Sequence, residues 1–230
     1  MNKPKKEIPA ILLAGGRPGN LSVMARMMAL GFNNIQKPKV AYIGTANGDN
    51  PVFFQMMKTM LAKAGAGKVI SVRLAKDKAD VNAARKVLVE SDIVFLSGGE
   101  VEDGMVWLEK HNLTSFLKDL YKAGKPFMGV SAGVIMMGTH WVHWDIEGND
   151  DTARLFDCLG IIPRLFDVHG ESEDWTELKT ALKLMGEGSH GYGLPRECVL
   201  SADSSGTLVN LEKEYLVFVN NGGRVSVKTN

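Results

Sequence analysis

The fold of this chain is indicated most clearly by residues 126–137, which read Pro126-Phe127-Met128-Gly129-Val130-Ser131-Ala132-Gly133-Val134-Ile135-Met136-Met137. The two apolar runs predict a buried strand before Ser131 and a helix after it. Gly129 and Gly133 have no Cβ, so strand and helix can pack closely around a strained turn with Ser131 at its apex. This is the G-x-S-x-G pattern, in which the serine hydroxyl is exposed at the end of a sheet. The alternative is a glycine-flanked turn with an incidental serine.

Short apolar runs alternate with amphipathic stretches along most of the chain. The runs predict strands buried on both faces, as in a parallel sheet covered by helices, at residues 10–13, 40–43, 69–72 and 93–96. Apolar residues at three- and four-residue spacing predict helices between them, at residues 53–64, 79–90 and 113–121. The alternation predicts an α/β fold with right-handed crossovers.

The alternation of strands and helices stops near the C-terminus. Short strands joined by turns are predicted there, at residues 198–202, 206–209, 214–219 and 224–227. Asn221-Gly222 is typical of a hairpin turn. We interpret this end as an antiparallel extension of the same sheet. The predicted fold is a three-layer α/β domain spanning residues 1–230, with a mostly parallel sheet flanked by helices, antiparallel strands at the C-terminal end, and residues 1–7 as a tail.

Composition narrows the classes of function. The formal net charge is +1, and the basic residues are dispersed, so a nucleic-acid partner is not expected. Cys158 and Cys198 are far apart, which favours free thiols in a reducing compartment. No apolar run approaches membrane-spanning length, and the N-terminus lacks the layout of a signal peptide. We expect a cytoplasmic protein that needs no membrane, cofactor or metal.

A serine nucleophile needs a base, and the chain has five histidines. His111 and His190 lie in polar connections typical of the surface. His140 and His143 follow the predicted helix closely. His169 is the best candidate because it ends an apolar run at residues 161–168, where a rigid element would hold it at the edge of the sheet. The alternative is a histidine satisfied by hydrogen bonds in the core.

Several segments occur in the order seen in the dipeptidase E and cyanophycinase family of serine peptidases, which this chain resembles over roughly residues 8–202. They are the turn at residues 129–133, the strand end at 96–99, and the segment from 159 to 169, together with residues 12–16 and 41–46. The resemblance implies a class I glutamine amidotransferase-like fold with a serine in place of that group's cysteine. It also implies Ser131 as nucleophile, His169 as base, and the N–H groups of Gly99 and Ala132 as the oxyanion hole. Gly98 and Glu100 complete the candidate oxyanion and substrate-binding residues.

The triad acid has two candidates. Asp145 resembles the position of the acid in dipeptidase E with a one-residue shift. Glu197 is the runner-up, one place after the position at which a glutamate falls in the cyanophycinase branch.

The chain departs from its relatives around the predicted site. Glu100 and Val101 follow the glycine pair, and an acidic stretch follows His169, where relatives often have an aromatic and then arginines. Acidic residues at 171–174 and 145–151 would repel a substrate with an N-terminal aspartate and favour a cationic one. The alternative is a solvated acidic helix start, since Ser172-Glu173-Asp174 is typical of one.

The sequence thus predicts a serine-type exopeptidase that hydrolyses small peptides or isopeptides through a Ser-His-Asp/Glu triad. The competing hypothesis is a catalytically degenerate relative that binds a small molecule or a partner in the same cleft. A small peptide is the expected ligand, and a homodimer is left open as an assembly.

Overall fold

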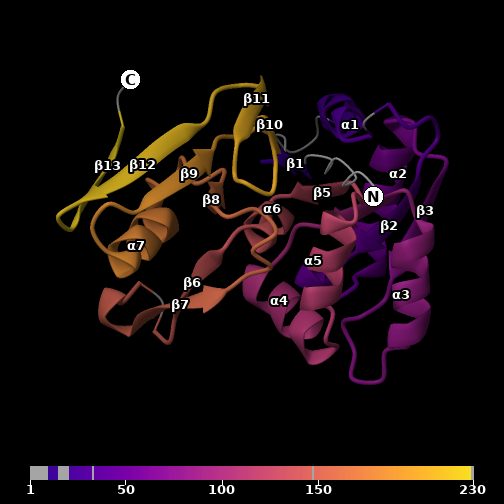
Figure 1. The fold of residues 1–230 in the computed structure, drawn as a ribbon, viewed down its shortest axis with the longest axis horizontal. Coiled ribbons are helices and arrows are strands. Elements are labelled where there is room, and N and C mark those ends of the chain that lie inside the picture. The colour runs from indigo at the N-terminus through magenta and orange to yellow at the C-terminus, as the bar shows by residue number, and fades with distance from the viewer. Residues whose placement is uncertain (1–9, 15–20, 33, 147, 229–230) are drawn as a thin grey trace, which may run out of the picture.

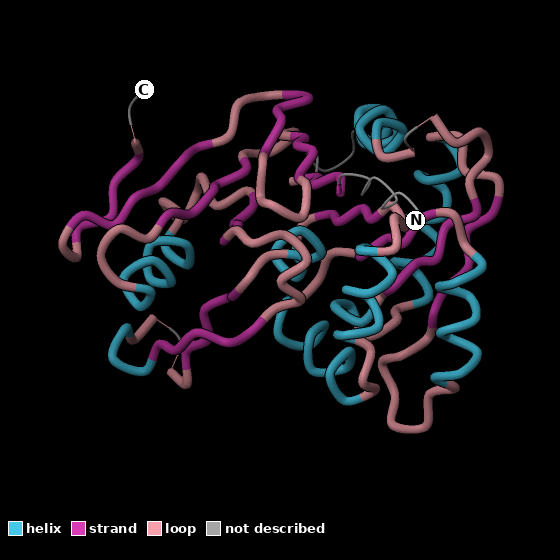
Figure 2. Tube along the Cα trace, in the orientation of Figure 1, coloured by secondary structure: helices cyan, strands magenta, loops and turns pink. Residues whose placement is uncertain are grey.

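A computed structural model describes residues 1–230 except 1–9, 15–20, 33, 147 and 229–230. The predicted tail and the glycine pair Gly15-Gly16 lie outside the described residues. Figure 1 shows the course of the chain, and Figure 2 distinguishes its helices, strands and loops. None of the helices among the described residues has the length and apolarity needed to cross a membrane.

The largest sheet described has seven strands in the order β11-β10-β1-β5-β4-β2-β3. The strands β1, β5, β4, β2 and β3 pair in parallel, whereas β10 and β11 add antiparallel strands beyond β1. The bounds are β1 Ala10–Leu13, β2 Lys39–Ile43, β3 Lys68–Val72, β4 Ile93–Leu96, β5 Phe127–Val130, β10 Val199–Ala202 and β11 Leu208–Glu212. The four apolar runs at the start of the chain therefore form strands within a residue of their predicted bounds.

Helices cover both faces of this sheet, which is why its strands are apolar without alternation. On β1, Leu12 packs into a core with α3, α4, α5 and α6, while Leu13 packs into a separate core with α1 and α2. The bounds are α1 Leu21–Leu30, α2 Pro51–Lys63, α3 Val81–Glu90, α4 Val101–Lys110, α5 Thr114–Lys122 and α6 Ala132–Met137. This arrangement confirms the predicted α/β fold with a mostly parallel sheet between helices.

A second sheet of four strands has the order β13-β12-β9-β8 and packs against helix α7. Its bounds are β8 Leu165–Val168, β9 His190–Leu194, β12 Leu216–Asn221 and β13 Arg224–Val227, with α7 at Thr176–Met185. A hairpin of β6 (His140–Trp144) and β7 (Ala153–Asp157) lies on the other side of α7 (Figure 1).

The antiparallel strands at the C-terminal end are confirmed, but their assignment to one sheet is wrong for β12 and β13. These strands pair with each other and with β9, so they belong to the second sheet. The physical reason is a separate small core, in which Phe218 of β12 packs with Trp175 and with Leu178 of α7. A one-sheet arrangement would leave this apolar cluster without a partner.

Candidate active site

The turn between β5 and α6 depends on glycine at two positions. A Cβ on Gly129 would lie 2.5 Å from the carbonyl oxygen of Gly133, and a Cβ on Gly133 would lie 2.2 Å from that of Leu96. Real Cβ contacts do not come this close, so a side chain at either position would push α6 away from β4 and β5. The glycine pattern therefore brings the start of α6 directly over the ends of the two central strands.

Ser131 lies between β5 and α6 in a strained backbone conformation, with φ 53° and ψ −124°. Its N–H donates to the carbonyl of Leu13 (2.9 Å), and its own carbonyl accepts from Val134 N (2.8 Å). Such conformations cost on the order of 1–3 kcal/mol and persist where the surroundings fix them. Here β1 and α6 hold Ser131 from both sides, and its Oγ lines a cavity.

His169 follows the last residue of β8 and comes from the second sheet. Its backbone is left-handed (φ 47°), and its N–H donates to the carbonyl of Leu194 on β9 (2.8 Å). The ring Nε2 lies 2.9 Å from Ser131 Oγ. Burial lowers the pKa of His169, and the positive charge of Arg196 lowers it further. A neutral imidazole in contact with a serine hydroxyl can accept its proton.

The loop after β4 lies against η1 (Thr45–Asn47) and has a backbone that only glycine can follow. Gly99 has φ 141°, and a Cβ there would lie 2.0 Å from the carbonyl oxygen of Ala46. That oxygen accepts the N–H of Glu100 at 2.6 Å. Among the described residues, the amides of Gly99 and Ala132 have no hydrogen-bond partner. The N–H groups of Gly99 and Ala132 are therefore free to donate to a ligand. The loop lies close to Ser131, because a Cβ built on Gly98 would be 3.1 Å from the Cβ of Ser131.

Asn47 fixes the orientation of this loop, and it was not among the residues that the sequence singled out. Its Nδ2 donates to the carbonyl of Gly98 at 2.9 Å and lies 3.2 Å from both the Tyr42 hydroxyl and Ser97 Oγ. In a trans peptide the C=O and the next N–H point in opposite directions. Holding the Gly98 carbonyl on Asn47 therefore turns the Gly99 N–H away from η1. The sequence signal was only an asparagine just beyond a buried strand.

Ser131 and His169 line a cavity of about 800 Å³, a volume typical of ligand sites. Gly99 and Ala132 contribute to the same wall, and Trp141 and Trp144 of β6 line the cavity as well. Of the charged residues described around the cavity, one is an arginine, Arg196, and five are acids: Glu100, Glu102, Asp167, Glu173 and Glu177. The cavity thus combines a serine–histidine pair with a negatively charged lining.

Asp167 is the second residue at the site that sequence reasoning missed, because it was read as part of an apolar run. It lies on β8 and is 4% exposed. Its Oδ1 accepts the N–H of Val168, whereas Oδ2 has no hydrogen-bond partner among the described residues. Burial raises its pKa to about 7, and the charges of Glu177 and Glu173 act in the same direction. A lone acid inside a buried strand was the available signal.

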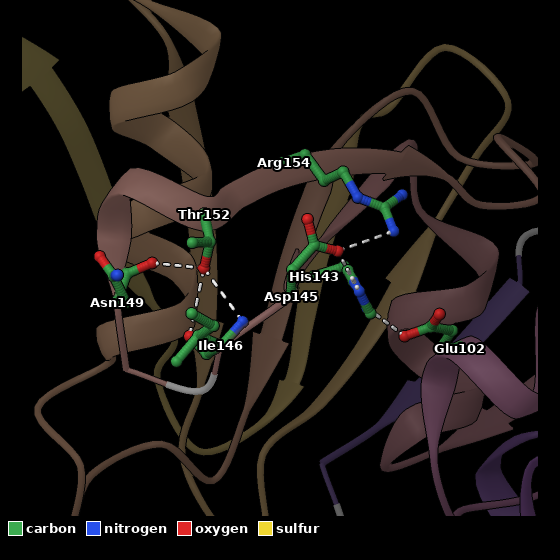
Figure 3. Close-up of polar contacts among 7 residues, drawn as sticks. All are labelled: Glu102, His143, Asp145, Ile146, Asn149, Thr152 and Arg154. Atoms are coloured by element: carbon green, nitrogen blue, oxygen red, sulfur yellow. Dashed lines mark hydrogen bonds and ion pairs between the residues drawn. The ribbon is translucent and has the colours of Figure 1, made fainter.

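Asp145, the first candidate for the triad acid, is 63% exposed and has other partners (Figure 3). Its Oδ1 lies 3.3 Å from His143 Nε2 and 3.3 Å from Arg154 Nη2. The other ring nitrogen of His143 contacts Glu102 on α4. These contacts connect the β6–β7 hairpin to α4 at the rim of the cavity.

Neither Asp145 nor Glu197 contacts His169 among the described residues. Glu197 follows β9 in a left-handed turn (φ 69°), and no polar contact of its carboxylate is found within the described chain. The acids that act on His169 are Glu171 and Glu173, and both raise its pKa. The structure thus brings Ser131 and His169 together, and the carboxylate of the triad stays a prediction.

Two other sequence interpretations are corrected. His111 is buried rather than on the surface, because its Nε2 contacts the carbonyls of Leu74 (2.9 Å) and Lys76 (3.1 Å). The acidic stretch at 171–174 is a series of turns, and α7 begins at Thr176. The left-handed backbone of Asp174 (φ 51°) and Trp175 (φ 57°) delays the helix. His190 is exposed as predicted, although it begins β9 and does not lie in a connection.

Comparisons with known proteins show the family of this chain. The model of peptidase family S51 matches residues 10–209. The uncharacterized peptidase YgaJ of Bacillus subtilis (strain 168) is 24% identical over 170 residues, which cover 71% of this chain and 69% of that protein.

Two solved structures have the same fold. One is a peptidase from an acI-B1 Actinobacterium, with a TM-score of 0.69 and 17% identity over 97% of this chain and 94% of that one. The other is a putative peptidase E protein from Listeria monocytogenes EGD-e, with a TM-score of 0.66 and 13% identity over 90% of this chain and 100% of that one. The match to the family model covers most of the chain, and we conclude that this chain belongs to peptidase family S51, the serine peptidases of the dipeptidase E type.

Proposed function

We propose that this serine peptidase hydrolyses small peptides or isopeptides, with Ser131 as nucleophile and His169 as general base. The observation that carries the proposal is the 2.9 Å contact between Ser131 Oγ and His169 Nε2. A cavity of about 800 Å³ can take a short peptide, which favours an exopeptidase.

The chemistry follows from the positions of the groups. Oγ of Ser131 attacks the scissile carbonyl while Nε2 of His169 accepts the hydroxyl proton. The oxyanion of the tetrahedral intermediate accepts hydrogen bonds from the amides of Gly99 and Ala132, and each such donor contributes roughly 10²–10³-fold in rate. The protonated imidazole then donates to the leaving amine. Water then attacks the acyl carbonyl while His169 accepts a proton from it, and the imidazolium returns that proton to Ser131 Oγ as the acyl group leaves as a carboxylic acid.

The lowered pKa of His169 supports this role. Burial and Arg196 disfavour the imidazolium, so the ring is neutral at pH 7 and ready to accept a proton. Its position is fixed through the backbone, because the N–H bond to Leu194 holds the turn after β8. The proposal therefore rests on the serine–histidine pair.

A fluorophosphonate probe tests the nucleophile directly, since it reacts with an activated serine and loses fluoride. We expect stoichiometric labelling of the wild type at Ser131 and no labelling or peptide hydrolysis in Ser131→Ala. Ser226→Ala is the matched control, because Ser226 is exposed on β13 and should label normally. Absence of labelling in the wild type would contradict the proposal and favour a protein that only binds ligands in this cavity.

The triad acid is tested separately with Asp145→Asn and Glu197→Gln. In serine proteases the corresponding change lowers kcat by about 10⁴-fold. A loss of that size in one variant would assign the acid to that residue. Small effects in both would mean that Ser131 and His169 act without either carboxylate.

A further inference from the structure

One carboxylate oxygen of a residue that lines the cavity lacks a hydrogen-bond partner among the described residues. Asp167 is 4% exposed, and among the described residues its Oδ2 makes no hydrogen bond. The residue nevertheless lines the cavity that contains Ser131 and His169. Charged groups as buried as this are paired in most proteins, because leaving the charged form unpaired away from water is costly. Asp167 therefore adds a negative charge without a counter-charge to the residues around the cavity.

Two neighbouring acids add further negative charge beside Asp167. Glu173 precedes α7, Glu177 lies in its first turn, and both line the cavity and raise the pKa of Asp167. The amides of Val168 and Leu178 act in the opposite direction without restoring its usual value. No Lys, Arg or His within the described chain forms an ion pair with any of the three acids. We call Asp167, Glu173 and Glu177 the acidic wall.

Gly170 packs closely against Asp167 and the ring of Trp175. A Cβ on Gly170 would lie 3.1 Å from Asp167 Oδ2, so any side chain there would crowd this oxygen. Trp141 and Trp144 line the same cavity from the β6–β7 hairpin. Indole faces attract cations, and guanidinium groups stack on them in particular. The acids and the aromatic rings therefore both favour a positively charged group on the ligand.

We propose that the acidic wall, together with Trp141 and Trp144, binds a positively charged group of the peptide substrate, either an ammonium or a guanidinium. This inference rests on the proposed peptidase function and names its substrate class. The lining of the cavity has one arginine, Arg196, against five acids, so its charge is predominantly negative. Cationic substrates would supply the counter-charge that Asp167 lacks.

The test compares substrates that differ only in charge. One arm uses a dipeptide with arginine and its analogue with citrulline, which has a similar shape and no charge. The other arm uses the citrulline dipeptide with a free and with an acetylated N-terminus, so that the side chain and the α-ammonium are distinguished. We expect removal of one of these charges to lower kcat/KM on the order of 10- to 100-fold, the effect of a charge-assisted hydrogen bond.

The variant Asp167→Asn identifies the group responsible. It keeps an acceptor for the Val168 amide and removes the charge, so the ratio of charged to uncharged substrate should fall to within about threefold of unity. Glu187→Gln is the matched control, because Glu187 is exposed after α7 and does not line the cavity. It should keep the wild-type ratio.

The outcomes separate the two proposals. Hydrolysis of all three peptides at similar rates, with normal phosphonate labelling, would overturn the acidic wall and leave the peptidase intact. A charge preference that persists in Asp167→Asn would also overturn it. A wild type that neither labels with phosphonate nor hydrolyses any peptide would overturn the proposed function itself.

Discussion

The substitution Asp167→Asn should make the protein more stable at alkaline pH. The pKa of this carboxyl is about 7 in the folded chain against an ordinary value of 3.8. A raised pKa means that the folded state binds the proton more tightly than the unfolded state. The free energy of unfolding therefore falls as the pH rises from about 4 to about 7, and it is constant with respect to this group above that.

The magnitude follows from the two pKa values. At 1.36 kcal/mol for each tenfold difference in proton affinity, the change from 3.8 to about 7 corresponds to about 4 kcal/mol at pH 8. Asparagine has no charge to bury and can still accept the N–H of Val168, as Oδ1 of Asp167 does. We expect a gain of about 2–4 kcal/mol at pH 8, after allowing about 1 kcal/mol for imperfect replacement of the carboxyl.

Urea denaturation at pH 8 and at pH 4 measures this difference. At pH 4 the wild-type carboxyl is already protonated in the folded state, so the advantage of the variant should shrink to less than about 1 kcal/mol. Equal or lower stability of Asp167→Asn at both pH values would refute the reasoning. Together with a lost charge preference, the expected gain would show that Asp167 is retained for binding at a cost in stability.

Three further changes address other parts of the site. Asn47→Ala removes the hydrogen bond that holds the Gly98 carbonyl and should lower kcat by roughly 10- to 100-fold, with a smaller change in KM. Steady-state peptide hydrolysis measures both constants. Asn210→Ala on β11 is the control, because Asn210 is exposed and its loss should change neither constant. The pH profile of wild-type kcat/KM should fall on the acid side with a midpoint below 6.5, because burial lowers the pKa of His169; a midpoint above 6.5 would contradict this. Gly133→Ala places a methyl group 2.2 Å from the carbonyl oxygen of Leu96 and should reduce the free energy of unfolding by at least about 2 kcal/mol in urea titrations; unchanged stability would mean that α6 shifts freely.

The sequence predicts the central sheet well because its strands are simple. β1 and β4 match their apolar runs residue for residue, since strands buried on both faces need continuous apolar character. The turn at Ser131 was equally predictable, because Gly129 and Gly133 are required by close packing on either side. Local pattern and tertiary contact agree in this part of the chain.

The second sheet was less predictable because its partners are distant in sequence. β12 pairs with β9, and nothing local to residues 216–221 distinguishes this edge from the edge of the larger sheet. The start of α7 was missed for a different reason. Its acidic residues suit a helix N-terminus, but Trp175 adopts a left-handed backbone to reach its place against Gly193 and Phe218. Tertiary packing outweighs local preference there.

At the site, the sequence predicted Ser131 and His169, which the structure brings into contact, and missed Asn47 and Asp167. Ser131 and His169 carry chemical signatures that can be read in one dimension, whereas the roles of Asn47 and Asp167 depend on geometry. Asn47 matters because its amide meets the carbonyl of Gly98, and Asp167 matters because one oxygen has no partner. Neither fact leaves a pattern in the order of residues.

The two proposed catalytic side chains come from different sheets: Ser131 follows β5 of the larger sheet, and His169 follows β8 of the smaller one. Peptide hydrolysis therefore depends on the two sheets staying packed against each other. A partial opening that separates β8 and β9 from α6 would abolish hydrolysis while the helices and the parallel strands persist. Enzymatic inactivation during gentle heating should accordingly precede the loss of far-ultraviolet circular dichroism, and a coincidence of the two curves would indicate that both sheets melt as one cooperative unit.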